Sequence, residues 1–283
     1  MKDAWRKYEQ LQQNLASLER VVVAFSGGVD STFLLHAAVC ELGRDNVLAL
    51  MADSETYPER ERVAAVALAE ELGSQYMVLP TSELAIPGYA ENPVNRCYFC
   101  KGNLFEHMIP VAKEKNFKAI VFGAIADDLG DFRPGLQAAK EKGIHAPLQE
   151  VMLYKNEIRY LSKEMGLRTW DKPSLACLSS RIPYGEKITP EKLSMVDKAE
   201  DFLWQLGFRQ VRVRTHEKIA RIEVAPTEMN QVLEVASMVV TKFKEFGYRY
   251  VTLDLQGYRT GSLNESIGKA EKKPVQNLLT NTP

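Results

Sequence analysis

The stretch "RVVVAFSGGVDSTFLLHAAVCELG", residues 20–43, contains a strand, a turn and a helix in direct succession. Val21 to Phe25 is a short apolar run rich in β-branched residues, which is typical of a strand buried in a parallel sheet. Apolar residues then recur at helical spacing as far as Leu42, and Gly43 provides a helix end. The turn "SGGVDS" between them is therefore expected at a sheet edge, where backbone amides face a ligand.

The side chains of this turn suit the binding of an anion. Gly27 and Gly28 allow unusual backbone angles and the close approach of a phosphate. Ser26 and Ser31 add hydroxyl donors, and Asp30 is expected to cap the helix or to help hold Mg²⁺. The stretch lacks the Gly-Lys-Ser/Thr of P-loop kinases and GTPases, so transfer of a γ-phosphoryl group is disfavoured. Taken alone, a pair of glycines fits a plain helix N-terminus equally well.

Strands and helices alternate through the rest of the N-terminal half. Strands are expected at 47–52, 76–79 and 118–124, and helical stretches at 57–72 and from Cys97 onward. This alternation predicts an α/β fold, a parallel sheet flanked by helices.

The proline-rich segment 171–190, "DKPSLACLSSRIPYGEKITP", ends that alternation and predicts a linker or an active-site loop. Beyond it we expect a smaller C-terminal α+β domain: a helix at 190–206, two alternating strands, one long helix and the strand "YRYVTLDL". The expected domains are residues 1–182 and 183–283.

Composition narrows the classes of partner. The chain has 36 lysines and arginines against 37 acidic residues among its 283 residues, which argues against a nucleic-acid partner. It has neither a bilayer-spanning apolar run nor a signal peptide, so we expect no membrane contact and a cytoplasmic location. Four cysteines are too few for a disulfide scaffold. Cys40, among apolar residues of a helix, is predicted to be a core residue.

The other three cysteines leave several chemistries open. Cys97 and Cys100 form a C-x-x-C pair, and Cys177 lies far along the chain. A structural zinc site would need a histidine such as His145 or His216 as fourth ligand. A thioredoxin-like pair would leave Cys177 unexplained. A [4Fe–4S] cluster on three thiolates would leave one iron open to bind sulfide.

The strand–SGGxDS–helix stretch resembles the pyrophosphate-binding loop of the N-type ATP pyrophosphatases, the PP-loop superfamily. The resemblance implies that ATP is cut between its α and β phosphates and that a substrate oxygen becomes an adenylate. It also implies a second nucleotide-contacting loop after a later strand, here "FGAIADDLGDFRPG" at 122–135. Its candidate residues are Gly123, Asp128 and Arg133. The alternative for its acidic residues is a solvated turn.

Three C-terminal stretches sharpen the resemblance: "ACLSSRIPYG" at 176–185, "LGFRQVRVRTHEKIARIEV" at 206–224 and "YRYVTLDLQGYRTGSLN" at 248–264. With SGGVDS and "DFRPGL", they resemble the LarE family of ATP-dependent sulfur transferases along nearly the whole chain. This implies a homo-oligomeric enzyme that uses ATP and Mg²⁺. It would adenylate a carboxylate of pyridinium-3,5-dicarboxylic acid mononucleotide and replace oxygen by sulfur, giving a thiocarboxylate. The reaction serves synthesis of the nickel-pincer cofactor of lactate racemase.

Members of that family differ in their sulfur source. Some sacrifice one cysteine located just before "SSR", and others hold a [4Fe–4S] cluster on three cysteines and take up sulfide repeatedly. This sequence matches the three-cysteine pattern with Cys97, Cys100 and Cys177, which favours the cluster. A sacrificial Cys177, next to Ala176, is an alternative. So are a [4Fe–4S]-dependent tRNA thiolase and a regulatory nucleotide-binding protein stapled by zinc.

Three arginines are candidates for binding the substrate. Strand alternation places Arg212 and Arg214 on one face, where two guanidiniums can hold a phosphate through paired charge-assisted bonds. The resemblance supports this role toward the mononucleotide phosphate. Arg181, near the third cysteine, is expected to offset negative charge on the substrate or cluster. The alternative for the strand is a solvated face balanced by Glu217 and Glu223.

Overall fold

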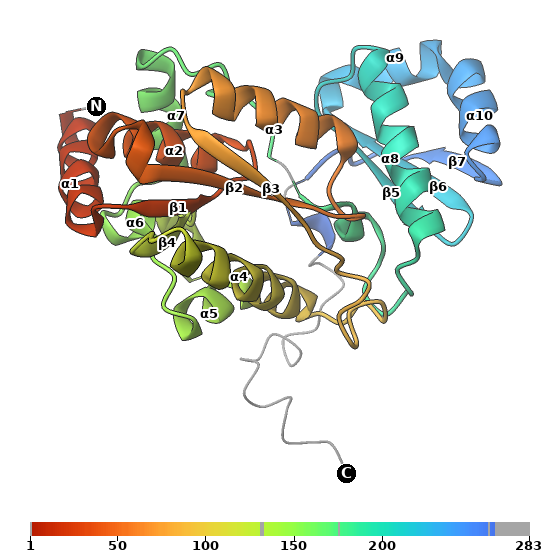
Figure 1. Cartoon of the computed structure of the whole chain (residues 1–283). Coiled ribbons are helices and arrows are strands. Elements are labelled where there is room, and N and C mark those ends of the chain that lie inside the picture. The colour runs from red at the N-terminus through yellow and green to blue at the C-terminus, as the bar shows by residue number, and fades with distance from the viewer. Residues whose placement is uncertain (1, 131–132, 175, 260, 264–283) are drawn as a thin grey trace. The chain divides into compact units, whose positions relative to one another are not determined.

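A computed structural model of the chain describes residues 2–130, 133–174, 176–259 and 261–263 (Figure 1). The chain forms two compact units. The first contains residues 1–82 and 97–175, and the second contains residues 83–96 and 176–283.

The first unit is built on a four-stranded parallel sheet with the order β3-β2-β1-β4. Its strands are β1 (Val21–Ala24), β2 (Val47–Asp53), β3 (Gln75–Pro80) and β4 (Ala119–Phe122). The predicted α/β fold with a parallel sheet is confirmed. Because β2 and β4 lie on opposite sides of β1, the sheet has a switch point at the carboxyl end of β1. Open α/β sheets bind their ligands at such a point, and here the chain enters the SGGVDS turn.

Helices cover both faces of this sheet (Figure 1). One face packs against α1 (Lys2–Leu18), α2 (Val29–Leu42), α3 (Glu59–Glu71), α7 (Lys155–Glu164) and the short α6 (Pro147–Glu150). The other packs against α4 (Arg96–Glu114) and α5 (Pro134–Glu141). Alternation along β1 feeds both cores, since Val21 and Val23 point to the first face and Val22 to the second. Short 3₁₀ turns lie at η1 (Arg44–Asn46) and η2 (Ala126–Asp128).

The second unit has its own mixed sheet and its own hydrophobic core, which confirms the smaller α+β module. Strand β5 (Val211–His216) pairs antiparallel with β6 (Ile219–Val224), which pairs in parallel with β7 (Tyr250–Leu253). Helices α8 (Pro190–Gln205), α9 (Met229–Glu234) and α10 (Ala236–Glu245), and the turns η3 (Leu178–Arg181) and η4 (Pro226–Glu228), complete it. One long helix was expected before β7; two form instead, because Val235 leaves the helical region (φ −101°, ψ 11°).

Residues 83–96, here called the arm, belong to the second unit although they precede α4 in sequence. The arm is fastened by Asn92, which is fully buried and has a positive φ of 56°. Its side-chain amide donates to the carbonyl oxygens of Ile182 (3.1 Å), Pro183 (2.7 Å) and Glu186 (3.2 Å). One buried side chain therefore satisfies three backbone acceptors of a loop that has no ladder of its own.

The boundary between the units lies at 175/176 and differs from the expected boundary at 182. The segment 176–182 is bound to the second unit by side-chain contacts. Arg181 makes two hydrogen bonds to Glu200 on α8, at 2.8 and 2.9 Å. The Tyr89 hydroxyl of the arm lies 2.9 Å from the Ser179 hydroxyl. Proline density located the linker, but these contacts set where it ends.

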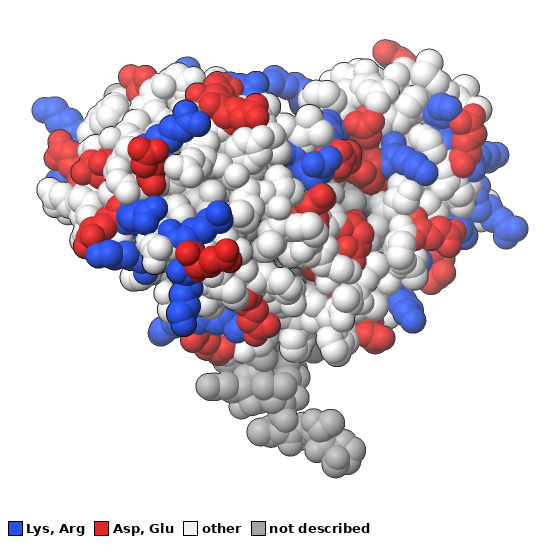
Figure 2. All heavy atoms as spheres, viewed as in Figure 1, with Lys and Arg blue, Asp and Glu red and all other residues white. Residues whose placement is uncertain are grey.

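On the face drawn in Figure 2, acidic and basic side chains are interspersed. None of the helices in the described part of the chain is long and apolar enough to cross a membrane.

Two glycines allow the chain to pack tightly around the start of α2. Gly27 has φ +61°, and a Cβ there would lie 2.9 Å from the Cβ of Ala65 on α3. At Gly123, just after β4, a Cβ would lie 3.0 Å from the backbone nitrogen of Ser31 and 3.2 Å from the carbonyl carbon of Asp30. Backbone atoms cannot move aside as a flexible side chain can, so both positions require glycine.

We predict that Gly123→Ala lowers the free energy of unfolding by about 1–3 kcal/mol, since the added methyl group overpacks the first turn of α2. Chemical denaturation measures the change. Gly102→Ala is the matched control, because a Cβ at that position of α4 would meet only Lys142 Cε, at 3.8 Å. This second change should stabilise the protein by about 0.5–1 kcal/mol through helix propensity. Equal stability of Gly123→Ala and wild type would contradict the packing described here.

Candidate functional site

The SGGVDS turn is closed by the hydroxyl group of Ser31. Its Oγ accepts a hydrogen bond from the Ser26 backbone nitrogen (3.3 Å), lies 3.1 Å from Ser26 Oγ and donates to the Gly28 carbonyl oxygen (3.3 Å). Ser31 is buried, whereas Ser26 is exposed. Of the two predicted hydroxyl donors, Ser26 therefore faces outward and Ser31 maintains the shape of the turn. The first amides of α2 have no intrahelical acceptor and are the natural binding groups for an anion.

Asp30 does not cap α2, which corrects one of the two roles expected for it. The N-cap is Gly28, and no side chain accepts a capping bond. Both carboxylate oxygens of Asp30 instead accept from Lys155 Nζ, at 2.7 and 2.6 Å. Burial raises the pKa of Asp30 and nearby Asp128 raises it further, although Lys155 and Arg159 act to lower it. Asp30 is thus a partly buried acid whose ammonium partner occupies the place that a bound cation would take.

The loop after β4 lies against the turn, as its predicted role requires. Gly123 contacts the backbone of Ser31, and Asp128 is near enough to Asp30 to affect its pKa. Asp128 accepts from the Ile125 backbone nitrogen (3.0 Å) and lies 3.0 Å from Arg133 Nη2. The Asp128 side chain is only 14% exposed, so it is not part of a solvated acidic turn. Arg133 is 53% exposed, and its contact with a phosphate remains a prediction.

Two lysines beside the turn were missed in the sequence. Lys155 binds Asp30, and Lys172 Nζ donates to the Gly27 carbonyl oxygen (3.0 Å) and lies 2.8 Å from Glu61 Oε2. Neither lysine belongs to a spacing pattern that marks a phosphate site. Tertiary packing alone brings them to the turn.

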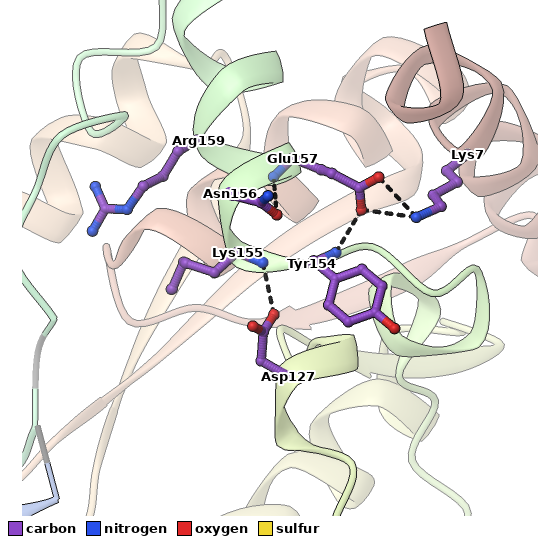
Figure 3. A pocket seen from close by; sticks show the side chains of 7 residues that line it. All are labelled: Lys7, Asp127, Tyr154, Lys155, Asn156, Glu157 and Arg159. Carbon is purple, nitrogen blue, oxygen red and sulfur yellow. Dashed lines mark hydrogen bonds and ion pairs between the residues drawn. The ribbon is translucent and has the colours of Figure 1, made fainter. Parts of the chain in front are cut away.

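An open depression of about 580 Å³ borders this region and shares Lys155 with it (Figure 3). Its lining residues are Lys7, Asp127, Tyr154, Lys155, Asn156, Glu157 and Arg159. Figure 3 shows the Glu157 carboxylate facing Lys7, 2.8 and 2.9 Å from its Nζ, and the Asp127 carboxylate accepting from the Lys155 backbone nitrogen (2.7 Å). These contacts fix the start of α7 and thereby the direction in which Lys155 reaches Asp30.

The cysteines are thiols placed in both units. Cys97 and Cys100 lie on the first turn of α4, three residues apart and therefore on one face of the helix; Cys97 is exposed and Cys100 half-buried. Cys177, half-buried, is the N-cap residue of η3 in the second unit. In the part of the chain that the structure describes, no three His, Cys, Asp or Glu side chains are gathered as metal ligands.

Cys40 is exposed, so the prediction that it is a core residue is wrong. It lies near the end of α2, and its sulfur is 3.6 Å from Nε2 of His36, one turn earlier. The apolar character of its neighbours in sequence did not reveal that this helix position faces outward.

Arg181 organises the backbone around Cys177. It is almost fully buried, and its Nη1 donates to the carbonyl oxygens of Ala176 (2.8 Å) and Cys177 (3.0 Å). Burial opposes the charge of Arg181, but Glu200 outweighs this and raises its pKa. The guanidinium expected to offset negative charge on a ligand is thus already matched by a carboxylate of the protein, and it shapes the cysteine loop.

Arg212 and Arg214 share one face of β5, as alternation predicted, but that face is buried. The alternative of a solvated strand face is therefore wrong. Arg214 donates to Glu223 (3.0 and 2.9 Å) and to the Ser180 carbonyl oxygen (2.7 Å). Arg212 donates to the Val211 carbonyl oxygen (2.7 Å), and its guanidinium carbon lies 5.3 Å from the ring centroid of Tyr258.

Arg181, Arg212, Arg214, Glu200 and Glu223 form what we call the arginine cluster. Burial, followed by the charge of Arg181, lowers the pKa of Arg212 to about 10. Three guanidiniums thus share a buried space with two carboxylates, and an anion placed beside Arg212 would relieve the cost of its charge. The structure brings the three predicted arginines together within one unit.

We predict that Lys155→Met destabilises the fold by about 1–3 kcal/mol near neutral pH, because the partly buried Asp30 carboxylate loses its charged partner. The change raises the pKa of Asp30 further. A raised pKa costs stability only where the acid would ionise, so the loss should be small near about pH 4 and grow toward about pH 8. Thermal melting at several pH values, with the exposed Lys118→Met as control, measures this. A loss independent of pH would contradict it.

Comparison with known proteins agrees with this geometry. The family model of NAD synthase matches residues 6–104, which include the sheet edge and the SGGVDS turn. The NH(3)-dependent NAD(+) synthetase of Hyperthermus butylicus is 41% identical over 62% of this chain and 63% of its own length.

Two relatives match along almost their whole length. The uncharacterized protein slr1717 of Synechocystis sp. is 44% identical over 93% of this chain and 98% of its own. The pyridinium-3,5-bisthiocarboxylic acid mononucleotide synthase of Lactiplantibacillus plantarum is 39% identical over 91% of this chain and 93% of its own. The chain therefore belongs to the LarE family of NAD synthase-like ATP pyrophosphatases.

Proposed function

We propose that this enzyme uses ATP to insert sulfur into pyridinium-3,5-dicarboxylic acid mononucleotide, forming a thiocarboxylate for the nickel-pincer cofactor of lactate racemase. The name of the Lactiplantibacillus plantarum relative supports the substrate. The arginine cluster is the observation that carries the proposal. It offers buried positive charge suited to a phosphate monoester, and Arg181 lies four residues after Cys177.

The chemistry divides into an activation and a substitution. The turn amides of α2 bind the phosphates of ATP, and Asp30 helps to hold Mg²⁺ in the place that Lys155 occupies. A substrate carboxylate oxygen attacks the α-phosphorus, and pyrophosphate leaves with the bonding electron pair. Hydrosulfide then adds to the acyl carbon, AMP departs with the oxygen, and a thiocarboxylate remains. Adenylation lowers the barrier because AMP is a far better leaving group than oxide.

Cys97, Cys100 and Cys177 are the proposed ligands of a [4Fe–4S] cluster. Three thiols, two of them one helical turn apart, match the donor chemistry of such a cluster. No three ligands are gathered in the described residues, so loading requires the two units to bring Cys177 to the pair. When bound, the cluster would supply an iron without a protein ligand, on which sulfide can be held.

The arm supports this assignment from within the second unit. Its last residue, Arg96, directly precedes Cys97 and lies over the ring of Tyr184, 4.7 Å from the centroid. Asn92 and Tyr89 bind the loop that follows Cys177. The chain leading into the cysteine pair is therefore tied to the chain leading out of the third cysteine. Assembly into a homo-oligomer also remains part of the proposal.

We predict that anaerobic reconstitution gives about four irons per chain, the content of one cluster. Cys100→Ala should lose the iron and the repeated turnover with sulfide. It should still release pyrophosphate from ATP when the mononucleotide is present, because activation does not use the thiol. Iron analysis, phosphate release and mass spectrometry of the product measure the three steps.

Cys40→Ala is the matched control, since Cys40 is an exposed thiol outside the proposed ligand set. A Cys100→Ala protein that keeps both iron and turnover would disprove the cluster. A single turnover that removes the mass of H₂S from Cys177 would establish the sacrificial route instead. Tight, salt-sensitive binding of bulk tRNA, with no activity on the mononucleotide, would replace the proposed substrate by RNA.

We predict that Arg212→Met weakens binding of the mononucleotide by about tenfold to a hundredfold, because a charge-assisted contact to its phosphate is lost. Calorimetry measures the affinity, and a melting curve checks that the unit remains folded. Arg249→Met, which removes an exposed arginine of the same unit, should leave the affinity unchanged. Unchanged binding by a folded Arg212→Met protein would remove this residue from the substrate site.

A further inference from the structure

Lys172 is held at the SGGVDS turn with a donor to spare. An ammonium group carries three N–H donors. Within the described residues, one donates to the Gly27 carbonyl oxygen (3.0 Å) and one faces Glu61 Oε2 (2.8 Å). The side chain is 21% exposed, so the third donor can reach a ligand in the turn.

Glu61 gives this lysine its position. It lies in the first turn of α3 and is only 6% exposed. Among the described residues, its Oε2 atom makes no hydrogen bond of normal geometry, so its contact with Lys172 is electrostatic. A buried carboxylate requires a cation, and this requirement draws Lys172 to the wall that α3 forms around the turn. Tyr57 belongs to the same wall and donates its hydroxyl to the Ser26 carbonyl oxygen (2.6 Å).

Arg159 holds the backbone that carries Lys172. From α7, its guanidinium donates to the carbonyl oxygens of Trp170 (2.6 Å) and Lys172 (2.8 Å). Lys163, one turn later, lies 4.7 Å from the ring centroid of Trp170. The loop is thus tied down at its backbone while the ammonium points to the turn. This arrangement does not resemble a surface lysine that happens to touch a carbonyl group.

We propose that Lys172 binds the β and γ phosphates of ATP and stabilises the pyrophosphate as it leaves, with Glu61 and Arg159 as positioning residues. The inference rests on the proposed ATP-dependent function and deepens it. Phosphate oxygens are stronger acceptors than a peptide carbonyl group, so a bound pyrophosphate would take the spare donor and compete for the one now bonded to Gly27. The charge that develops on the leaving group would then meet a fixed ammonium.

The test compares magnesium pyrophosphate and AMP as ligands by equilibrium binding, which needs neither sulfide nor a cluster. Lys172→Met should weaken pyrophosphate binding by about tenfold to a hundredfold and leave AMP binding unchanged. Lys172→Arg, which keeps the charge, should recover part of the loss. Lys142→Met, which removes a lysine paired with Glu106 elsewhere in the same unit, should alter neither affinity.

Three outcomes would overturn the assignment. If Lys172→Met lowers the melting temperature but keeps the pyrophosphate affinity, the lysine only supports the fold. If both ligands weaken equally, the substitution has disrupted the turn as a whole. If the wild-type protein binds neither pyrophosphate nor ATP, the proposed ATP chemistry itself fails, and that result is distinct from a defect confined to the variant.

Discussion

The close contact of three backbone segments around the SGGVDS turn is the constraint on which the nucleotide site depends. Gly27 lies against Ala65, and Gly123 lies against Ser31, with no space for a side chain at either glycine. This packing fixes the first turn of α2 at the switch point of the sheet. The positions from which acids and lysines surround that turn follow from it, because they sit on elements that the same packing holds in place.

In the second unit, buried charge plays the corresponding role. Removing arginine and glutamate side chains from water is expensive, and ion pairing only compensates for part of the cost. The pairs Arg181–Glu200 and Arg214–Glu223 carry most of this burden, and they hold Arg212 among them. An apolar core would be a cheaper way to stabilise a domain of this size. The retained charges are better explained by a ligand that carries negative charge.

Local patterns predicted what local forces decide. The run Val21–Phe25, the glycines after it and the spacing up to Leu42 define strand, turn and helix within a few residues, and the structure agrees. Alternation also placed Arg212 and Arg214 on one face. What lies over that face depends on η3 and distant acids, so burial was not predictable. The same holds for Lys155 and Lys172, whose partners are more than a hundred positions away in sequence for the bonds to Asp30 and Gly27.

The arm has a consequence for how the chain is made. During synthesis, residues 83–96 leave the ribosome long before the loop 182–186 that Asn92 binds. The second unit is discontinuous in sequence, so it cannot complete its fold domain by domain in the order of translation. Its nascent arm waits with an unsatisfied amide until the later half emerges. For the same reason, a fragment that starts at residue 176 would lack part of its own interior, and complementation by a peptide spanning the arm would restore it.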